Sequence, residues 1–164
     1  MPNFRQVELP PGIEGMLFLH SMPGRHEDLA SAWREIEALK ITRIVSLAGI
    51  DEIHQKSPDY ALAVEADEMP CDRDEYPIPD FGVPADRAGF WEWAGVLATR
   101  LQRGERLLVH CGAGFGRTGT VAICILLALG LQLEDAKSAV AAAHSEPEKP
   151  EQRELVAWCA ERQG

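Results

Sequence analysis

The chain has 164 residues, which is enough for one domain with a substantial hydrophobic core. Hydrophobic residues make up 46% and charged residues 26%, as is ordinary for a soluble globular protein. The formal net charge of −10 disfavours nucleic acid and anionic membranes as partners, so an anionic ligand would have to be attracted locally by its own pocket.

The first part of the chain predicts two strands with a helix between them. Residues 16–24, "MLFLHSMPG", indicate a short strand that ends in a Pro-Gly turn. Residues 26–40 predict a helix, because apolar side chains recur at helical spacing. Residues 41–48, "ITRIVSLA", form a near-continuous run typical of a strand buried on both faces. For residues 60–70 we expect a strand in the second half.

The second part predicts a long loop, one more strand and four helices. The proline-rich residues 71–84 indicate a loop, and Pro84 can open a helix over 85–104. A strand is expected at 106–110, and helices at 117–129, 132–143 and 150–161. Strands that alternate with helices indicate an α/β fold with a largely parallel central sheet flanked by helices. No linker or repeat interrupts the pattern, so residues 1–164 are expected to form a single domain.

The glycine-rich segment "HCGAGFGRTG", residues 110–119, has two incompatible interpretations. Its last six residues match the GxGxxG of a dinucleotide-binding turn, which normally closes the first βα unit and is followed by a further strand. Here the segment follows at least two strands, and only helices and a loop are expected after it. The pattern by itself is weak, and its position disfavours a dinucleotide site.

The second interpretation is a phosphate cradle around a cysteine nucleophile. Cys111 would end the strand, and Arg117 would open the next helix and grip two phosphate oxygens with its planar guanidinium. Thr118 could donate a hydrogen bond to the sulfur and help it leave, while the ring of His110 would brace the loop. Backbone N–H groups of the intervening residues would form an anion nest that also favours the thiolate; these residues are Gly112, Ala113, Gly114, Phe115 and Gly116.

A phosphoester also needs a proton donor for its leaving oxygen, and a carboxylic acid on a loop beside the pocket would serve. Asp72, Asp74 and Asp80 all lie upstream in the proline-rich loop, whereas Asp86 fits better as a helix cap. Residue type and position leave the first three open.

These segments resemble the cysteine-based protein-tyrosine phosphatases, and the dual-specificity branch in particular. "HCGAGFGRTG" is similar to the HCxxGxxR[ST] signature of that superfamily. The stretches "SMPGRHEDLASAWREIEALKITRIVSL", "YPIPDFGVPAD" and "ERLLVHCGAGFGRTGTVA" resemble the cyclin-dependent-kinase-associated phosphatase group and its small bacterial relatives. The resemblance implies a dual-specificity-phosphatase-like fold and selects Asp80, 31 residues before Cys111, as the general acid. It also implies a water-orienting role for Gln152, although the motif that usually precedes that segment is absent and a surface position at a helix N-terminus fits equally well.

We therefore expect a phosphatase that acts on phosphorylated proteins or peptides, on phosphotyrosine and also on phosphoserine or phosphothreonine, through a phosphocysteine intermediate. A lipid or small-metabolite phosphatase is an alternative, although residues 112–116 contain no Lys or Arg to hold extra phosphates. A non-catalytic phosphate-binding module would have little use for both Cys111 and Asp80. A sulfur- or arsenate-handling enzyme would place its cysteine differently in the topology.

The remaining composition bears on location and cofactors. Four cysteines without CxxC spacing, and the lack of an apolar signal core or a membrane-length apolar run, are typical of a reduced, cytoplasmic protein. The five histidines do not cluster with other ligands, so we expect no metal and no organic cofactor. We expect a monomer that binds neither nucleic acid nor membrane.

Overall fold

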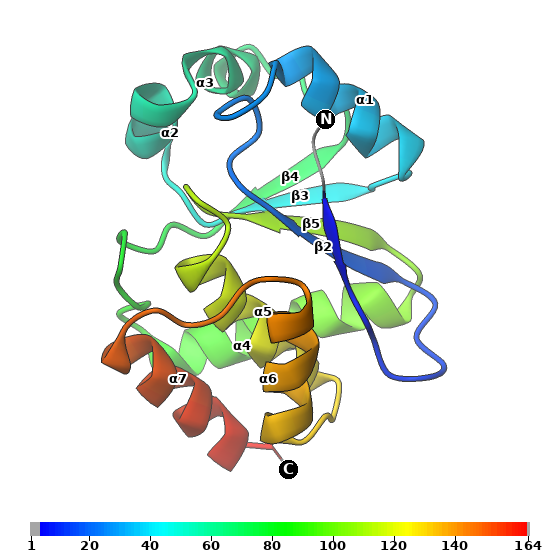
Figure 1. The fold of residues 1–164 in the computed structure, drawn as a ribbon, viewed down its shortest axis with the longest axis vertical. Helices are drawn as coiled ribbons and strands as arrows, with labels where there is room; N and C mark the ends of the chain where they lie inside the picture. The colour runs from blue at the N-terminus through cyan, green and yellow to red at the C-terminus, as the bar shows by residue number, and fades with distance from the viewer. Residues whose placement is uncertain (1–3, 164) are drawn as a thin grey trace.

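A five-stranded sheet separates two layers of helices in the computed structural model, which describes residues 4–163 (Figure 1). Helices α1 to α3 cover one face, and α4 to α7 cover the other. In chain order the elements are β1 (Arg5–Val7), β2 (Met16–His20), α1 (Leu29–Ala38), β3 (Arg43–Ser46), α2 (Ile50–Lys56), α3 (Pro58–Glu65), β4 (Asp72–Glu75), α4 (Arg87–Gln102), β5 (Arg106–His110), α5 (Gly116–Ala128), α6 (Leu133–Ala142) and α7 (Pro150–Glu161).

The strand order is β1-β2-β5-β3-β4, with β1 antiparallel to β2 and every other pair parallel. This arrangement confirms the expected α/β class and the largely parallel sheet. His20 and Ser46 both stand level with His110, so the carboxyl ends of β2, β3 and β5 meet at one edge. Ligands of open α/β sheets bind outside such an edge.

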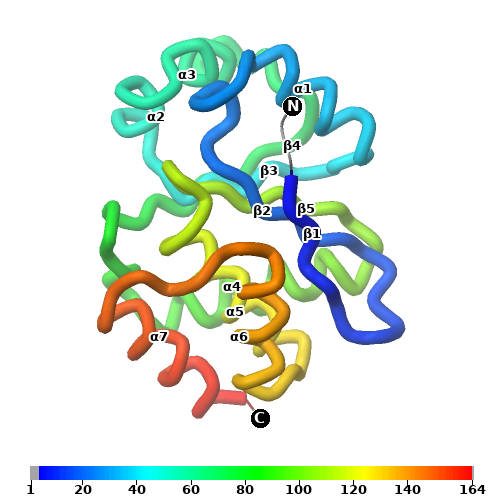
Figure 2. The backbone as a smooth tube through the Cα atoms, in the orientation of Figure 1, coloured from blue at the N-terminus to red at the C-terminus, as the bar shows by residue number. Residues whose placement is uncertain are grey.

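The core explains why the long helices form where the sequence predicts them. In β3, Ile44 faces the α1 side and Val45 the opposite side, which confirms a strand buried on both faces. Helix α5 is buried on all sides because α4, α6 and α7 pack around it, which explains why its sequence is apolar all round (Figure 2). Trp93 stacks on Tyr76 at 4.2 Å between ring centroids and packs against the same core.

No helix among residues 4–163 is long and apolar enough to span a membrane.

Four local expectations were wrong or incomplete. No strand forms in the second half of residues 60–70, because helix α3 runs to Glu65 and pairing with β3 begins only at Asp72, in β4. The expected loop at 71–84 begins with β4, whose polar residues pair with β3 at the edge of the sheet. Neither α2 nor β1 was predicted. Helix α4 does not begin at Pro84, but the prediction that Asp86 caps it is confirmed, because Asp86 Oδ1 accepts a hydrogen bond from Gly89 N–H at 3.0 Å.

Candidate active site

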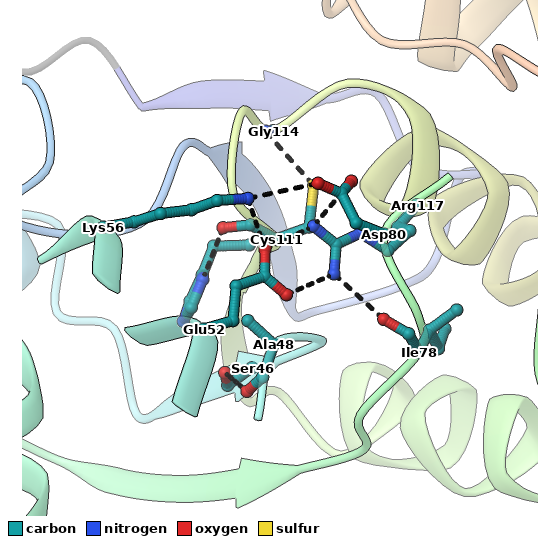
Figure 3. A network of polar contacts seen from close by, with 10 residues as sticks. Ser46, Ala48, Glu52, Lys56, Ile78, Asp80, Cys111, Gly114 and Arg117 are labelled. Atoms are coloured by element: carbon teal, nitrogen blue, oxygen red, sulfur yellow. Dashed lines mark hydrogen bonds and ion pairs between the residues drawn. The ribbon is translucent and has the colours of Figure 1, made fainter. Parts of the chain in front are cut away.

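The glycine-rich loop connects the carboxyl end of β5 to the N-terminus of α5. Cys111 is buried at its start, and the Gly114 N–H donates to the Cys111 sulfur at 3.2 Å (Figure 3). Gly114 has φ +82°, and a Cβ there would lie 2.6 Å from the His20 backbone. Only glycine fits both the left-handed conformation and the close contact with β2. The loop therefore curls around the sulfur in the way that an anion nest requires.

Arg117, in the first turn of α5, reaches back over the loop and is held by three partners. Glu52 of α2 accepts from both terminal nitrogens, at 2.8 and 2.7 Å, and the Ile78 carbonyl accepts at 2.9 Å. Asp80 Oδ1 lies 3.1 Å from Arg117 Nη2. Burial alone would raise the pKa of Glu52, but hydrogen bonds from Arg117 and Lys56 lower it to about 2. The guanidinium is thereby held beside the sulfur (Figure 3).

Of the three open carboxylates, the structure brings only Asp80 to the loop. Its Oδ2 lies 3.2 Å from Lys56 Nζ, and Figure 3 shows the carboxyl group close to Cys111 and Arg117. Asp72 and Asp74 sit on β4 and pair with Arg43, at 3.5 and 2.7 Å. Asp80, which the resemblance selected, thus lines the same cavity as Cys111, and its role as the acid stays a prediction.

His110 supports the loop from the core. Its Nδ1 lies 3.0 Å from the Cys111 carbonyl and its Nε2 lies 2.8 Å from the Tyr60 hydroxyl, which also accepts from Arg73 Nε at 3.1 Å. Burial lowers the pKa of His110 to about 3, so the ring is neutral at physiological pH. A neutral ring with its proton on Nδ1 satisfies both contacts, since the hydroxyl then donates to Nε2.

Thr118 and Gln152 occupy different surroundings. The Thr118 hydroxyl is buried and has no hydrogen-bond partner within residues 4–163, the Cys111 sulfur included. Gln152 is buried, not on the surface, and its Oε1 accepts from the Glu148 and Lys149 N–H groups at 2.8 and 3.1 Å. Its Nε2 donates to the Gly82 carbonyl at 3.2 Å. Gln152 thus connects the N-terminus of α7 to the loop that carries Asp80.

A narrow cavity of about 190 Å³ opens over the sulfur. Its lining residues are Arg25, Lys56, Asp80, Phe81, Cys111, Ala113, Gly116, Arg117, Glu148 and Gln152. Phe81 is 57% exposed at this cavity. Although the loop itself has no Lys or Arg, Arg25 and Lys56 place two cations within 3.2 Å of where a Cβ of Gly112 would lie. The lack of loop cations is therefore a weaker argument against multiply phosphorylated ligands than the sequence suggested.

Sequence reasoning missed several residues that surround the loop from elsewhere in the chain. Glu52, Lys56 and Arg25 come from α2 and the loop after β2, while Arg5 and Ser145 contact the Gly114 carbonyl from β1 and the loop after α6. The spacing of Glu52 and Lys56, four residues apart on a helix, was the one local signal available. Among residues 4–163 there is no group of three or more His, Cys, Asp or Glu side chains placed to hold a metal ion.

Residues 13–160 match the family model described as "Swiss Army Knife protein, DSP-PTPase phosphatase domain". The chain is 46% identical over 54 residues to cyclin-dependent kinase inhibitor 3 of Rattus norvegicus, which covers 33% of this chain and 25% of that protein. It is 28% identical over 110 residues to the putative tyrosine phosphatase 067L of Invertebrate iridescent virus 3. This match covers 65% of this chain and 43% of that protein. The chain thus spans less than half the length of these two relatives.

A solved structure of kinase associated phosphatase, with serine in place of its catalytic cysteine, superimposes with a TM-score of 0.79. The match covers 94% of this chain and 92% of that one at 21% identity, so it bears on the fold alone.

Proposed function

Because the chain belongs to the DSP-PTPase phosphatase domain family, we propose that it hydrolyses phosphotyrosine in proteins, and phosphoserine or phosphothreonine as well, through a phosphocysteine intermediate. The observation that supports this most strongly is the convergence of Cys111, Arg117 and Asp80 on one narrow cavity. These are a nucleophile, an oxyanion clamp and an acid, which is the set that cofactor-free phosphoester cleavage requires.

In the first step the Cys111 thiolate attacks phosphorus, and an S–P bond forms as the bond to the leaving oxygen breaks. Loop N–H groups and the Arg117 fork hold the other phosphate oxygens as their charge shifts. The bound phosphate also becomes a partner of Arg117 in competition with Asp80. Asp80 then gives its proton to the leaving oxygen.

In the second step a water attacks the phosphocysteine. Asp80, now a carboxylate, takes a proton from this water, and the S–P bond breaks to release inorganic phosphate and the thiolate. The buried Thr118 hydroxyl, which lacks another partner among residues 4–163, can donate to the departing sulfur. Gln152 lines the same cavity and can orient the water through its amide group.

The exposed ring of Phe81 beside the cavity favours an aromatic phosphoester, because it offers an apolar surface to the ring of phosphotyrosine. A multiply phosphorylated small molecule or lipid headgroup is the second candidate, since Arg25 and Lys56 bring cations to the cavity. Initial rates on phosphotyrosine, phosphothreonine and inositol phosphate substrates at equal concentration distinguish the two. A clearly higher rate on inositol phosphates would refute the proposal of a protein substrate and favour the small-molecule or lipid candidate.

The reaction itself is tested with p-nitrophenyl phosphate and the variant Cys111→Ser. We expect turnover to disappear while inorganic phosphate still binds, because Arg117 and the nest remain in place. A Cys124→Ser variant serves as the control, since Cys124 is buried in α5 away from the cavity. Turnover near the wild-type rate in Cys111→Ser would refute the nucleophile, and tight phosphate binding without turnover in the wild type would indicate a binding module.

A further inference from the structure

Arg5 lies on the edge strand β1 and contacts the outer side of the glycine-rich loop. This loop, residues 111–116, is called the phosphate loop below. Its Nη2 donates to the Gly114 carbonyl at 2.8 Å, and its Nη1 lies 3.0 and 2.8 Å from the Ala143 and His144 carbonyls. Nη1 also donates to Ser145 Oγ at 3.1 Å. Figure 2 shows the dark-blue β1 beside the orange segment that follows α6. One guanidinium thus ties the loop to the C-terminal end of α6.

The Gly114 carbonyl has a second donor on the same side. Ser145 is buried, and its Oγ donates to this carbonyl at 2.7 Å while accepting from Arg5. Two donors on the outer side of the loop hold the carbonyl in one direction. The contact between the Arg5 guanidinium and the ring of Phe115, at 5.2 Å, fixes the following residue on the same outer side.

The orientation of this carbonyl determines where a catalytic donor points. The Gly114–Phe115 peptide is planar and trans, so its N–H points opposite to its C=O. With the carbonyl turned outward to Arg5 and Ser145, the Phe115 N–H is turned to the inner side of the loop. Within residues 4–163 no carbonyl or side chain accepts from this N–H. It is therefore free to bind a phosphate oxygen.

Arg5 also brings a charge to the loop. Within residues 4–163 it forms no ion pair with a carboxylate. Burial lowers the pKa of Arg5, whereas attraction to Cys111 acts to raise it. Cys111 is faced by further charged groups from other elements, namely Arg25, Lys56, Asp80, Arg117 and Glu148. Arg5 differs from these because it acts from outside the cavity.

We propose that Arg5 is a positioning residue for the phosphate loop: it holds the Gly114 carbonyl outward so that the Phe115 N–H faces the phosphate, and its charge supports the Cys111 thiolate. Ser145 assists as the second donor to the same carbonyl. This inference rests on the proposed function, because its role is to shape the cradle in which that reaction takes place.

Three variants separate the geometric role from the electrostatic role. Arg5→Met removes both, whereas Arg5→Lys keeps the charge but cannot reach the Gly114 and His144 carbonyls with a two-armed fork. Ser145→Ala removes the other donor. Two measurements apply to each variant, namely the vanadate inhibition constant and the pH midpoint of Cys111 alkylation by iodoacetamide.

Loss of one oxyanion donor costs about 10²–10³ in rate. Because Ser145 still holds the carbonyl in Arg5→Met, we expect a loss of about tenfold in kcat/KM and vanadate affinity, and an alkaline shift of the alkylation midpoint. Arg5→Lys should restore the midpoint but not the vanadate affinity. The double variant with Ser145→Ala should lose more than the product of the single losses, because the two residues hold one carbonyl.

The control is Arg43→Met, which removes a partly buried arginine from the opposite end of the sheet, where it pairs with Asp74. It should lower thermal stability and leave vanadate inhibition and alkylation unchanged. Arg5→Met with only a lowered Tm would overturn the inference. If the wild type proves inactive, the proposed function fails separately, and an unchanged alkylation midpoint in Arg5→Met would still refute the role of Arg5.

Discussion

Replacing Glu52 by glutamine removes the carboxylate that holds Arg117 and leaves a side chain of the same shape. In the folded protein the pKa of Glu52 is about 2, against an ordinary value of 4.5. At about 1.4 kcal/mol for each pH unit, that difference corresponds to roughly 3 kcal/mol of stability at pH 7. The figure is an upper value, since the amide oxygen introduced by Glu52→Gln can still accept one hydrogen bond.

The sign of the pH dependence follows from the lowered pKa. A carboxylate that binds protons less readily in the folded state stabilises it above the unfolded pKa, and this stabilisation is lost as the pH falls from about 4.5 towards 2. The wild type should therefore exceed Glu52→Gln by as much as about 3 kcal/mol at pH 7 but by only about 1 kcal/mol near pH 3.

Urea denaturation at the two pH values measures the difference. The matched control is Glu105→Gln, because Glu105, like Glu52, pairs with two cationic side chains; these are Arg43 and Arg100, at the opposite end of the sheet. Both variants should be less stable at pH 7, but only Glu52→Gln should also lose kcat/KM on p-nitrophenyl phosphate. An equal stability loss for Glu52→Gln at pH 7 and pH 3, or unchanged kinetics, would refute the reasoning.

Three further variants test other parts of the site. Arg117→Lys should be nearly as inactive as Arg117→Ala, because a point charge cannot replace the bidentate fork; steady-state kinetics with Lys near wild type would mean that only charge matters. Asp80→Asn should lower kcat by about 10²–10⁴-fold and remove the alkaline limb of the pH profile, with Asp74→Asn as the control at a position away from the cavity; retention of that limb would exclude Asp80 as the acid. Gly114→Ala should cost at least about 1–3 kcal/mol in denaturation experiments, because a Cβ would lie 2.6 Å from the His20 backbone at φ +82°; wild-type stability would show that the loop shifts easily.

The sequence was sufficient wherever structure is local. The strand–turn–helix around Cys111 is encoded within about ten adjacent residues, and α1 carries a clear apolar period. Short edge elements were missed, because β1 has three residues and β4 is the polar sequence "DRDE", which becomes a strand only by pairing with β3. The stability of β4 comes from a neighbour that no local pattern records.

The same limit applies to the site. Cys111 and Arg117 are separated by five residues, so their shared cradle could be predicted from spacing alone. Glu52 is 65 residues from the arginine that it holds, and Arg5 is 109 residues from Gly114. Neither pairing leaves a trace in one sequence, because each depends on how the sheet brings distant segments together. The choice of Asp80 needed the family resemblance for the same reason.

The link from Gln152 to the Gly82 carbonyl has a consequence for synthesis on the ribosome. The chain is synthesised from its N-terminus, so Cys111 is made before α7. During that interval the loop that carries Asp80 lacks its anchor in α7. The contact between Gln152 and Gly82 joins residues 70 positions apart, so it is expected to form late, because ordering the intervening chain costs conformational entropy. A nascent or truncated chain that lacks α7 thus carries the proposed nucleophile without this anchor for the loop of Asp80, and we expect removal of α7 to lower the rate of phosphoester hydrolysis.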